Sequence, residues 1–225
     1  MSDDFNSQTA RQEILNRIRT MQGRKPADKP LELAKARQWV SARVGGPRPP
    51  RTDQVLDQFC QRSLDMLCTL DRVSSEAQAL AACQAWIQSH GLAGAGIAVW
   101  PELKALDWAG TGLSVRFGKP LDTDLTSITS TAYAVAETGT LVLCSSSETP
   151  TSAHLLPQNH VALVKASQVE QTLEDVFARM RREGVEMPRA LNCVSGPSRT
   201  ADIEQTIVLG AHGPFRVHLI VIEGL

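Results

Sequence analysis

The chain has 225 residues, of which 42% are hydrophobic and 21% are charged, and its formal net charge is −1. This is the ordinary composition of a soluble globular protein, and the length is sufficient to bury a full hydrophobic core. No apolar run approaches the roughly 20 residues that cross a bilayer, and the polar, acidic start MSDDFNSQTA argues against a secretory signal, so we expect a cytoplasmic protein without a membrane span.

The first 51 residues are basic, with 11 Lys and Arg against 5 Asp and Glu, whereas residues 52–225 carry 12 against 19. Thr9 and Gln12 have the spacing of a capping box, which predicts a helix that Gly23 ends. Apolar spacing predicts a second helix over about 31–44, and GGPRPPR (45–51) then predicts a linker. We therefore expect a helical basic arm and linker over 1–51 and a second domain over 52–225.

The net charges of the two parts are +6 and −7. A basic arm can bind nucleic acid, but this arm has neither interleaved aromatic residues nor a recognised motif, so we expect no nucleic-acid partner. The opposite charges favour an arm that lies on the acidic body of its own or a neighbouring subunit. The second arrangement would create a homo-oligomer through the arm.

Two helices and two strands are predicted before residue 118. Residues 53–69 have amphipathic spacing, and the pair Ser75 and Gln78 fits a capping box that opens a helix ended by Gly91. The short apolar run 95–100 predicts a buried strand, and residues 113–117 are strand-like.

The remaining elements alternate between strands and helices. Strands are predicted over 141–144 and 160–165, followed by a helix that Ser167 and Glu170 would open by a capping box. Two later strands, near 190–194 and 217–222, flank a short helical turn around 201–206. This alternation predicts an α/β fold with a mostly parallel sheet covered on both faces.

Three glycine-containing polar clusters lie beside these strands. In the first, Glu137, Thr138, Gly139 and Thr140 precede the strand LVLC. Glycine beside a strand end lets the backbone turn and approach a ligand, where Glu137 could act as a nucleophile, a general base or a hydrogen-bond acceptor. The alternative is a solvated turn in which Gly139 only permits the bend.

The second cluster contains Gly196, Ser198, Arg199 and Thr200, between a strand and the expected helical turn. Amides at a helix N-terminus, with hydroxyls and a guanidinium, form a natural site for phosphate or carboxylate. Asp202, close behind, could contribute to the site or simply complement the helix dipole. The cluster has neither the GK[ST] element of a Walker loop nor a GxGxxG fingerprint.

The third cluster, GAHGP (210–214), places His212 next to Gly213. The loop could bring the imidazole to a ligand as an acid–base group, or it could be a tight surface turn. His154 and His160 have no standard metal-ligand spacing, so we predict no metal site.

The cysteines predict no cofactor of the chain's own. They are five in number and no two form a CxxC pair, which argues against a disulfide scaffold, a zinc ribbon and a self-contained iron–sulfur cluster. Most are expected to be buried hydrophobes. Cys144 or Cys193, near the polar clusters, could instead be a reactive thiol.

AETGT, HLLPQNH (154–160), SGPSRTADIE and GAHGP occur in an order that resembles the lactate utilization protein C family, or LUD domain, over about 126–225. The resemblance implies a Rossmann-like fold similar to sugar-phosphate isomerases, glucosamine-phosphate deaminases and coenzyme A transferases. It also implies a role in oxidising L-lactate to pyruvate with iron–sulfur partner proteins.

Two functions are compatible with this resemblance. The chain could be an accessory subunit of a lactate-oxidising system, since it lacks cysteine runs that would hold a cluster. Alternatively, it could be an enzyme or sensor that binds a small anionic metabolite, such as a phosphosugar, a carboxylate or a coenzyme A-type ligand, with Glu137, Arg199 and His212 in the site.

Overall fold

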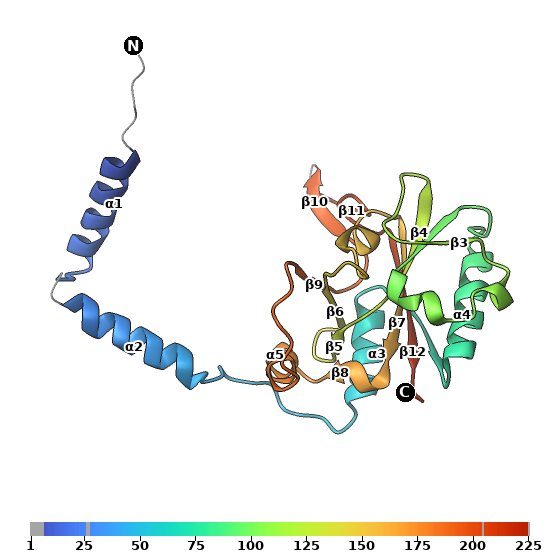
Figure 1. The fold of residues 1–225 in the computed structure, drawn as a ribbon, viewed down its shortest axis with the longest axis horizontal. Coiled ribbons are helices and arrows are strands. Elements are labelled where there is room, and N and C mark those ends of the chain that lie inside the picture. The colour runs from blue at the N-terminus through green and yellow to red at the C-terminus, as the bar shows by residue number, and fades with distance from the viewer. Residues whose placement is uncertain (1–6, 26–27, 204, 225) are drawn as a thin grey trace, which may run out of the picture. The chain divides into compact units, whose positions relative to one another are not determined.

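The computed structural model describes residues 7–25, 28–203 and 205–224 (Figure 1). Contacts divide the chain into two units, Met1–Pro50 and Arg51–Leu225. Among the described residues, no helix has both the length and the apolar composition to cross a membrane.

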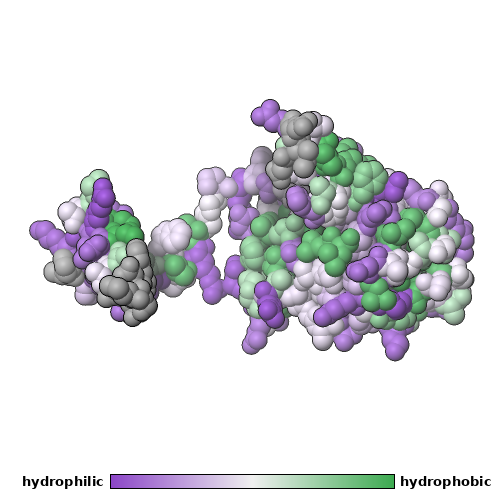
Figure 2. Space-filling model, turned by 90° about the horizontal axis from the view of Figure 1, so that it is seen from above, coloured by the Kyte–Doolittle hydropathy of each residue, from purple (hydrophilic) through white to green (hydrophobic). Residues whose placement is uncertain are grey.

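The N-terminal unit contains two helices, α1 (Ser7–Met21) and α2 (Lys29–Ala42), as predicted. Because α1 begins at Ser7, Thr9 lies inside the helix and does not cap it. Apolar side chains on both helices are largely exposed, at 61% for Ile14 and 72% for Trp39. Figure 2 shows the resulting mixture of hydrophobic and hydrophilic surface on this unit, at the left of the view.

A six-stranded sheet forms the centre of the C-terminal unit. Its strands follow the order β1-β12-β7-β4-β2-β3, and every neighbouring pair is parallel. The bounds of the strands are β1 Thr69–Val73, β2 Gly96–Val99, β3 Val115–Phe117, β4 Asp124–Ser130, β7 Asn159–Lys165 and β12 Arg216–Ile222. The predicted α/β fold with a parallel sheet is therefore confirmed.

A smaller mixed sheet has the order β8-β5-β6-β9. Its strands are β5 Tyr133–Val135, β6 Thr140–Cys144, β8 Val169–Glu170 and β9 Leu191–Val194. A separate antiparallel hairpin consists of β10 (Arg199–Ile203) and β11 (Thr206–Leu209). Short 3₁₀ helices complete the unit: η2 Pro101–Ala105, η3 Ala109–Thr111, η4 Thr151–His154 and η5 Ala166–Gln168.

Three hydrophobic clusters hold these layers together. Helix α4 (Glu76–Ser89) packs on one face of the large sheet, where Ile87 belongs to the same buried cluster as Val161 and Ile220. The smaller sheet and α3 (Val55–Asp65) cover the opposite face. Helix α5 (Leu173–Arg182) then packs on the smaller sheet through Val176 and Met180. The large sheet is thus buried on both sides (Figure 1).

The Ser75 cap of α4 is confirmed, since the Ser75 side chain accepts a hydrogen bond from the Gln78 amide. The predicted helix start at Ser167 is wrong. The Gln168 side chain accepts a hydrogen bond from the Lys165 amide in the 3₁₀ turn η5, and residues 169–170 pair with β5 as strand β8. Helix α5 begins after Thr172, whose hydroxyl accepts from the Asp175 amide.

Two other helical predictions need correction. Helix α3 ends at Asp65 rather than near residue 69, because Leu67 adopts a left-handed conformation (φ 68°) and Thr69 starts β1. The helical turn expected around 201–206 is absent from the described residues of this range, because β10 continues to Ile203 and β11 starts at Thr206. Glu204 lies outside the described residues, as does the side chain of Asp202.

Candidate functional site

The first polar cluster forms the tight turn between antiparallel strands β5 and β6. Gly139 has a φ of +61°, and a Cβ atom there would lie 2.5 Å from the amide nitrogen of Ser63 and 2.6 Å from the carbonyl carbon of Arg62. The Glu137 amide donates to the carbonyl oxygen of Gln171 at 3.0 Å. The turn therefore packs against the end of α3, which requires glycine whether or not a ligand binds.

Hydroxyl groups connect the first cluster to the second. The Thr138 and Thr140 hydroxyl oxygens are 2.6 Å apart, and the Thr140 hydroxyl lies 2.6 Å from that of Ser195. Gly196, with a φ of +80°, leaves no room for a side chain beside the carbonyl oxygen of Met66. Both glycines thus approach the last turn of α3 and the residue that follows it.

Ser198 joins the second cluster to the third. Its amide donates to the Pro214 carbonyl at 2.9 Å, its carbonyl accepts from the Gly210 amide at 2.9 Å, and its hydroxyl accepts from the His212 amide at 3.4 Å. Gly213 packs on the same serine, since a Cβ there would lie 3.3 Å from the Ser198 Cβ. The three clusters are therefore neighbours in space, although they are far apart in sequence.

Arg199 and Thr200 lie in β10, with Arg199 directed to the sulfur of Met66 at 3.6 Å. Because this segment is a strand, the predicted anion site at a helix N-terminus loses its basis. The third cluster leads into the amino end of β12, where Arg216 pairs with Asn159. That edge of the sheet is opposite to the carboxyl ends of the strands.

A cavity of about 830 Å³ opens at the carboxyl ends of the parallel strands. Ser130 ends β4, Lys165 ends β7, Ile222 ends β12, and Trp100 directly follows β2; all four line the cavity. None of the lining residues belongs to the three glycine-containing clusters. No local pattern in the sequence indicates this cavity, because its walls come from residues spread between positions 76 and 222.

The position of the cavity agrees with a general property of open α/β sheets. Such sheets bind ligands outside the carboxyl ends of their strands, at the topological switch point. This is the place between two neighbouring strands from which the chain continues to opposite sides of the sheet. Here the chain runs from β2 outward to β3, then returns to β4 and continues through β7 to β12. The reversal lies between β2 and β4, where Trp100 and Ser130 line the cavity.

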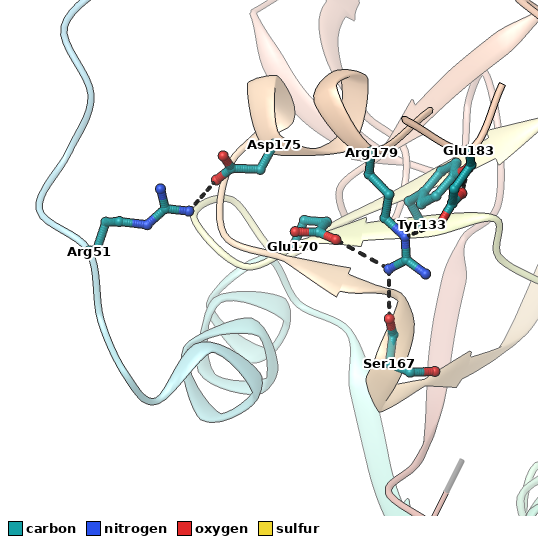
Figure 3. A network of polar contacts seen from close by, with 7 residues as sticks. All are labelled: Arg51, Tyr133, Ser167, Glu170, Asp175, Arg179 and Glu183. Carbon is teal, nitrogen blue, oxygen red and sulfur yellow. Dashed lines mark hydrogen bonds and ion pairs between the residues drawn. The ribbon is translucent and has the colours of Figure 1, made fainter. Parts of the chain in front are cut away.

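A polar network surrounds Arg179, close in sequence to residues that line the cavity (Figure 3). The Arg179 guanidinium bonds Glu183 at 2.7 Å, Glu170 at 3.2 Å and the Ser167 carbonyl at 2.7 Å. The Tyr133 hydroxyl donates to the other oxygen of Glu183 at 2.7 Å. These contacts fix the end of α5 on β5 and β8, and the lining segment 185–188 follows directly from that end.

Three histidines are buried in the C-terminal unit and are neutral in the folded protein. Burial lowers the pKa of His154 to about 4 and that of His160 to about 3. Burial likewise lowers the pKa of His218 to about 4, although Asp71 opposes this shift. Within the described ranges, no three His, Cys, Asp or Glu side chains gather into a group that could hold a metal ion.

Cys144 lines the cavity, but its environment does not favour a reactive thiolate. Burial raises the pKa of Cys144, and the neighbouring Cys193 raises it further. Burial also raises the pKa of Cys193. Since the thiolate is the nucleophilic form, neither thiol is activated in this structure.

Residues 119–222 match the family model of the LUD domain. The chain is 37% identical over 99 residues to lactate utilization protein C of Halalkalibacterium halodurans, covering 43% of each chain. It is 30% identical over 141 residues to lactate utilization protein C of Bacillus licheniformis, covering 60% of this chain and 58% of the relative. The alignments thus span about half the length of these relatives.

A solved structure is also similar. The crystal structure of a DUF162 family protein from Deinococcus radiodurans superposes with a TM-score of 0.56 and 28% identity, and the match covers 77% of this chain and 99% of that one. The similarity therefore extends well beyond residues 119–222.

Proposed function

We propose that this chain, which carries a LUD domain over residues 119–222 and is distantly homologous to lactate utilization protein C, is an accessory subunit of a cytoplasmic L-lactate utilization system. The observation that carries the proposal is the alignment with relatives of that name at 30–37% identity. In this system L-lactate is oxidised to pyruvate, and iron–sulfur partner proteins accept the two electrons that are released.

The arrangement of potential ligands supports an accessory role. Cys60, Cys68 and Cys83 are buried, and burial raises the pKa of Cys144 and of Cys193. A redox cluster needs several thiolates at one place. We therefore assign the electron-accepting centres to the partner proteins.

Disruption of the gene in its source organism tests this proposal. The mutant should grow slowly on L-lactate and normally on pyruvate, and a plasmid copy should restore growth. Affinity purification of the tagged chain from lactate-grown cells should recover iron–sulfur proteins, which absorption spectra would identify. Unimpaired growth on L-lactate would reject the proposal.

The second function is binding of a small anionic metabolite by Glu137, Arg199 and His212. The hydrogen bonds of Ser198 to the third cluster support it, because they bring two of the polar loops together. The packing of Gly139 on α3 supports the purely structural alternative. A thermal-shift screen of lactate, pyruvate, phosphosugars and coenzyme A derivatives distinguishes ligand binding from a purely structural role. If a ligand binds at this site, Glu137→Gln and Arg199→Ala should each remove the increase in melting temperature that it causes.

A further inference from the structure

The interior of the carboxyl-edge cavity is less polar than its residue types suggest. The Thr131 hydroxyl donates to the Tyr133 carbonyl at 2.6 Å, and the Trp100 indole donates to the Pro150 carbonyl at 3.1 Å. The Gln168 amide donates to the Thr131 carbonyl and accepts from the Lys165 amide. These lining groups therefore bond to the protein itself, and a ligand meets mainly their hydrocarbon surfaces.

The hydroxyls of the 145–149 segment are engaged in the same way. Thr149 donates to the Cys144 carbonyl at 2.7 Å and lies 2.8 Å from the Ser146 hydroxyl. The Ser145 hydroxyl accepts from the Ala190 amide at 2.9 Å. Apolar side chains complete the walls, including Leu103, Leu106, Leu163, Val185 and Met187. Such an interior favours the body of an apolar ligand.

The ionised groups that line the cavity are mostly acidic. Glu76, Glu102 and Glu186 contribute three negative charges, and Lys165 contributes one positive charge. The Lys165 ammonium already lies 3.4 Å from the Glu76 carboxylate. Glu76 also lies in the first turn of α4, where it complements the helix dipole that would otherwise attract an anion. A cationic group is thus favoured at the mouth, and a carboxylate or phosphate is repelled.

We infer that this cavity binds a small amphipathic amine, with its apolar body against the walls and its ammonium group at Glu102 and Glu186. Both glutamates are exposed lining residues. Glu102 accepts a hydrogen bond from the half-buried Ser130 hydroxyl on one carboxylate oxygen, which leaves its other oxygen for the ammonium group of a ligand. The cavity is separate from the three polar clusters, and amine binding there does not depend on the proposed role in lactate utilization.

Calorimetric titration of the full-length chain with three matched probes tests the inference. The probes 4-phenylbutylamine, 4-phenylbutanol and 5-phenylpentanoate share one phenylbutyl body and carry a positive, a neutral and a negative head group. We expect the amine to bind about tenfold more tightly than the carboxylate. The preference should weaken at high salt, because exposed charges are then screened.

Variants locate the site and the source of the preference. Replacing Glu102→Gln together with Glu186→Gln should reduce the amine affinity to that of the alcohol, whereas Ala105→Trp at the rim should weaken all three probes. The pair Glu148→Gln with Glu174→Gln removes the same charge from exposed positions outside the lining, and it should leave the preference intact. Equal or tighter binding of the carboxylate, no binding of the amine, or an equal effect of the control pair would each overturn the inference.

Discussion

Gly139 occupies a position that only glycine can fill without strain. Replacement by alanine forces a side chain into a φ of +61° and places its Cβ 2.5 Å from the Ser63 nitrogen. The left-handed conformation costs about 1–2 kcal/mol, and overpacking against backbone adds about 1–3 kcal/mol. We therefore expect Gly139→Ala to lower the free energy of unfolding, as measured by urea denaturation, by the sum of these two costs.

Gly112 provides a matched control for this prediction. Its φ is +63°, but a Cβ there would meet no atom within 4 Å. Gly112→Ala should therefore show only the conformational cost of about 1–2 kcal/mol. If both variants lose the same free energy of unfolding, close packing of Gly139 against α3 does not contribute to the cost of Gly139→Ala.

Gly139 also illustrates what the sequence could and could not predict about single residues. A glycine between polar residues at a strand end indicates that another group approaches the backbone closely. It does not reveal whether that group is a ligand or the chain itself. At Gly139 and Gly196 the approaching groups include backbone atoms at the end of α3, which is 60 or more residues away in sequence.

The buried histidines predict a loss of stability on mild acidification. The pKa of His154 and of His218 falls to about 4 on folding, from an ordinary value of 6.5. Below pH 6.5 the unfolded chain therefore binds more protons than the folded chain, so the stability is fully present above 6.5 and declines as the pH falls toward 4. Each histidine should contribute a loss of about 1 kcal/mol between pH 7 and 5.5.

Urea denaturation at several pH values between 5.5 and 7 measures this effect above the range in which carboxylates titrate. His154→Gln should flatten the pH dependence, even if it lowers the stability at every pH. If His154→Gln does not change how the free energy of unfolding depends on pH, the attribution of part of this dependence to His154 is wrong.

At the scale of elements, the start of α5 is determined by Thr172. The Thr172 hydroxyl accepts from the Asp175 amide at 3.3 Å and donates to the Asp175 carboxylate at 3.0 Å. Arg51 holds the same carboxylate at 2.9 Å (Figure 3). Thr172→Ala should lower the free energy of unfolding by about 1 kcal/mol, which is the usual contribution of an N-cap.

Two further variants make the cap prediction specific. Thr172→Ser keeps the hydroxyl and should recover most of the loss. Ser167→Ala removes the side chain of the sequence-predicted cap, and because Ser167 is exposed and precedes β8, its effect should stay within about 0.5 kcal/mol. The reverse order of effects would show that the helix begins at Ser167 in solution.

The two candidate caps illustrate why the sequence predicted the presence of helices and strands better than the residues at which they begin and end. Amphipathic spacing correctly predicted α5, but Ser167 with Glu170 and Thr172 with Asp175 are both acceptable cap patterns. Pairing of residues 169–170 with β5 decides between them. Strand β4, with the sequence DLTSITS, went unpredicted because its hydroxyl-rich side chains lack an apolar pattern, although several of them are buried.

At the scale of the whole chain, strand order decides where the candidate site lies. The alternation of strands and helices predicted a parallel sheet, but it could not predict that β12 inserts between β1 and β7. That insertion brings Ile222, near the end of the chain, to the same cavity as Glu76 and Lys165. A cavity assembled by long-range pairing in this way leaves no local signature in the sequence.

The opposite charges of the two units predict a salt-sensitive assembly, in which the basic arm of one copy binds the acidic body of another. Removal of residues 1–50 should then convert an oligomer into a monomer. The hydrophobic clusters of the C-terminal unit include no residue before Val55, so the truncated chain should keep its unfolding transition.

Sedimentation velocity of the full-length and truncated chains tests both parts of this prediction. At about 0.1 M salt the Debye length is roughly 10 Å, and at 1 M it is roughly 3 Å, so an assembly held by charge should dissociate between these conditions. An assembly held by the exposed apolar residues of the arm, such as Ile14 and Trp39, should persist at 1 M salt and disappear only on truncation. A full-length chain that sediments as a monomer at low salt would rule out the arm as an oligomerisation element.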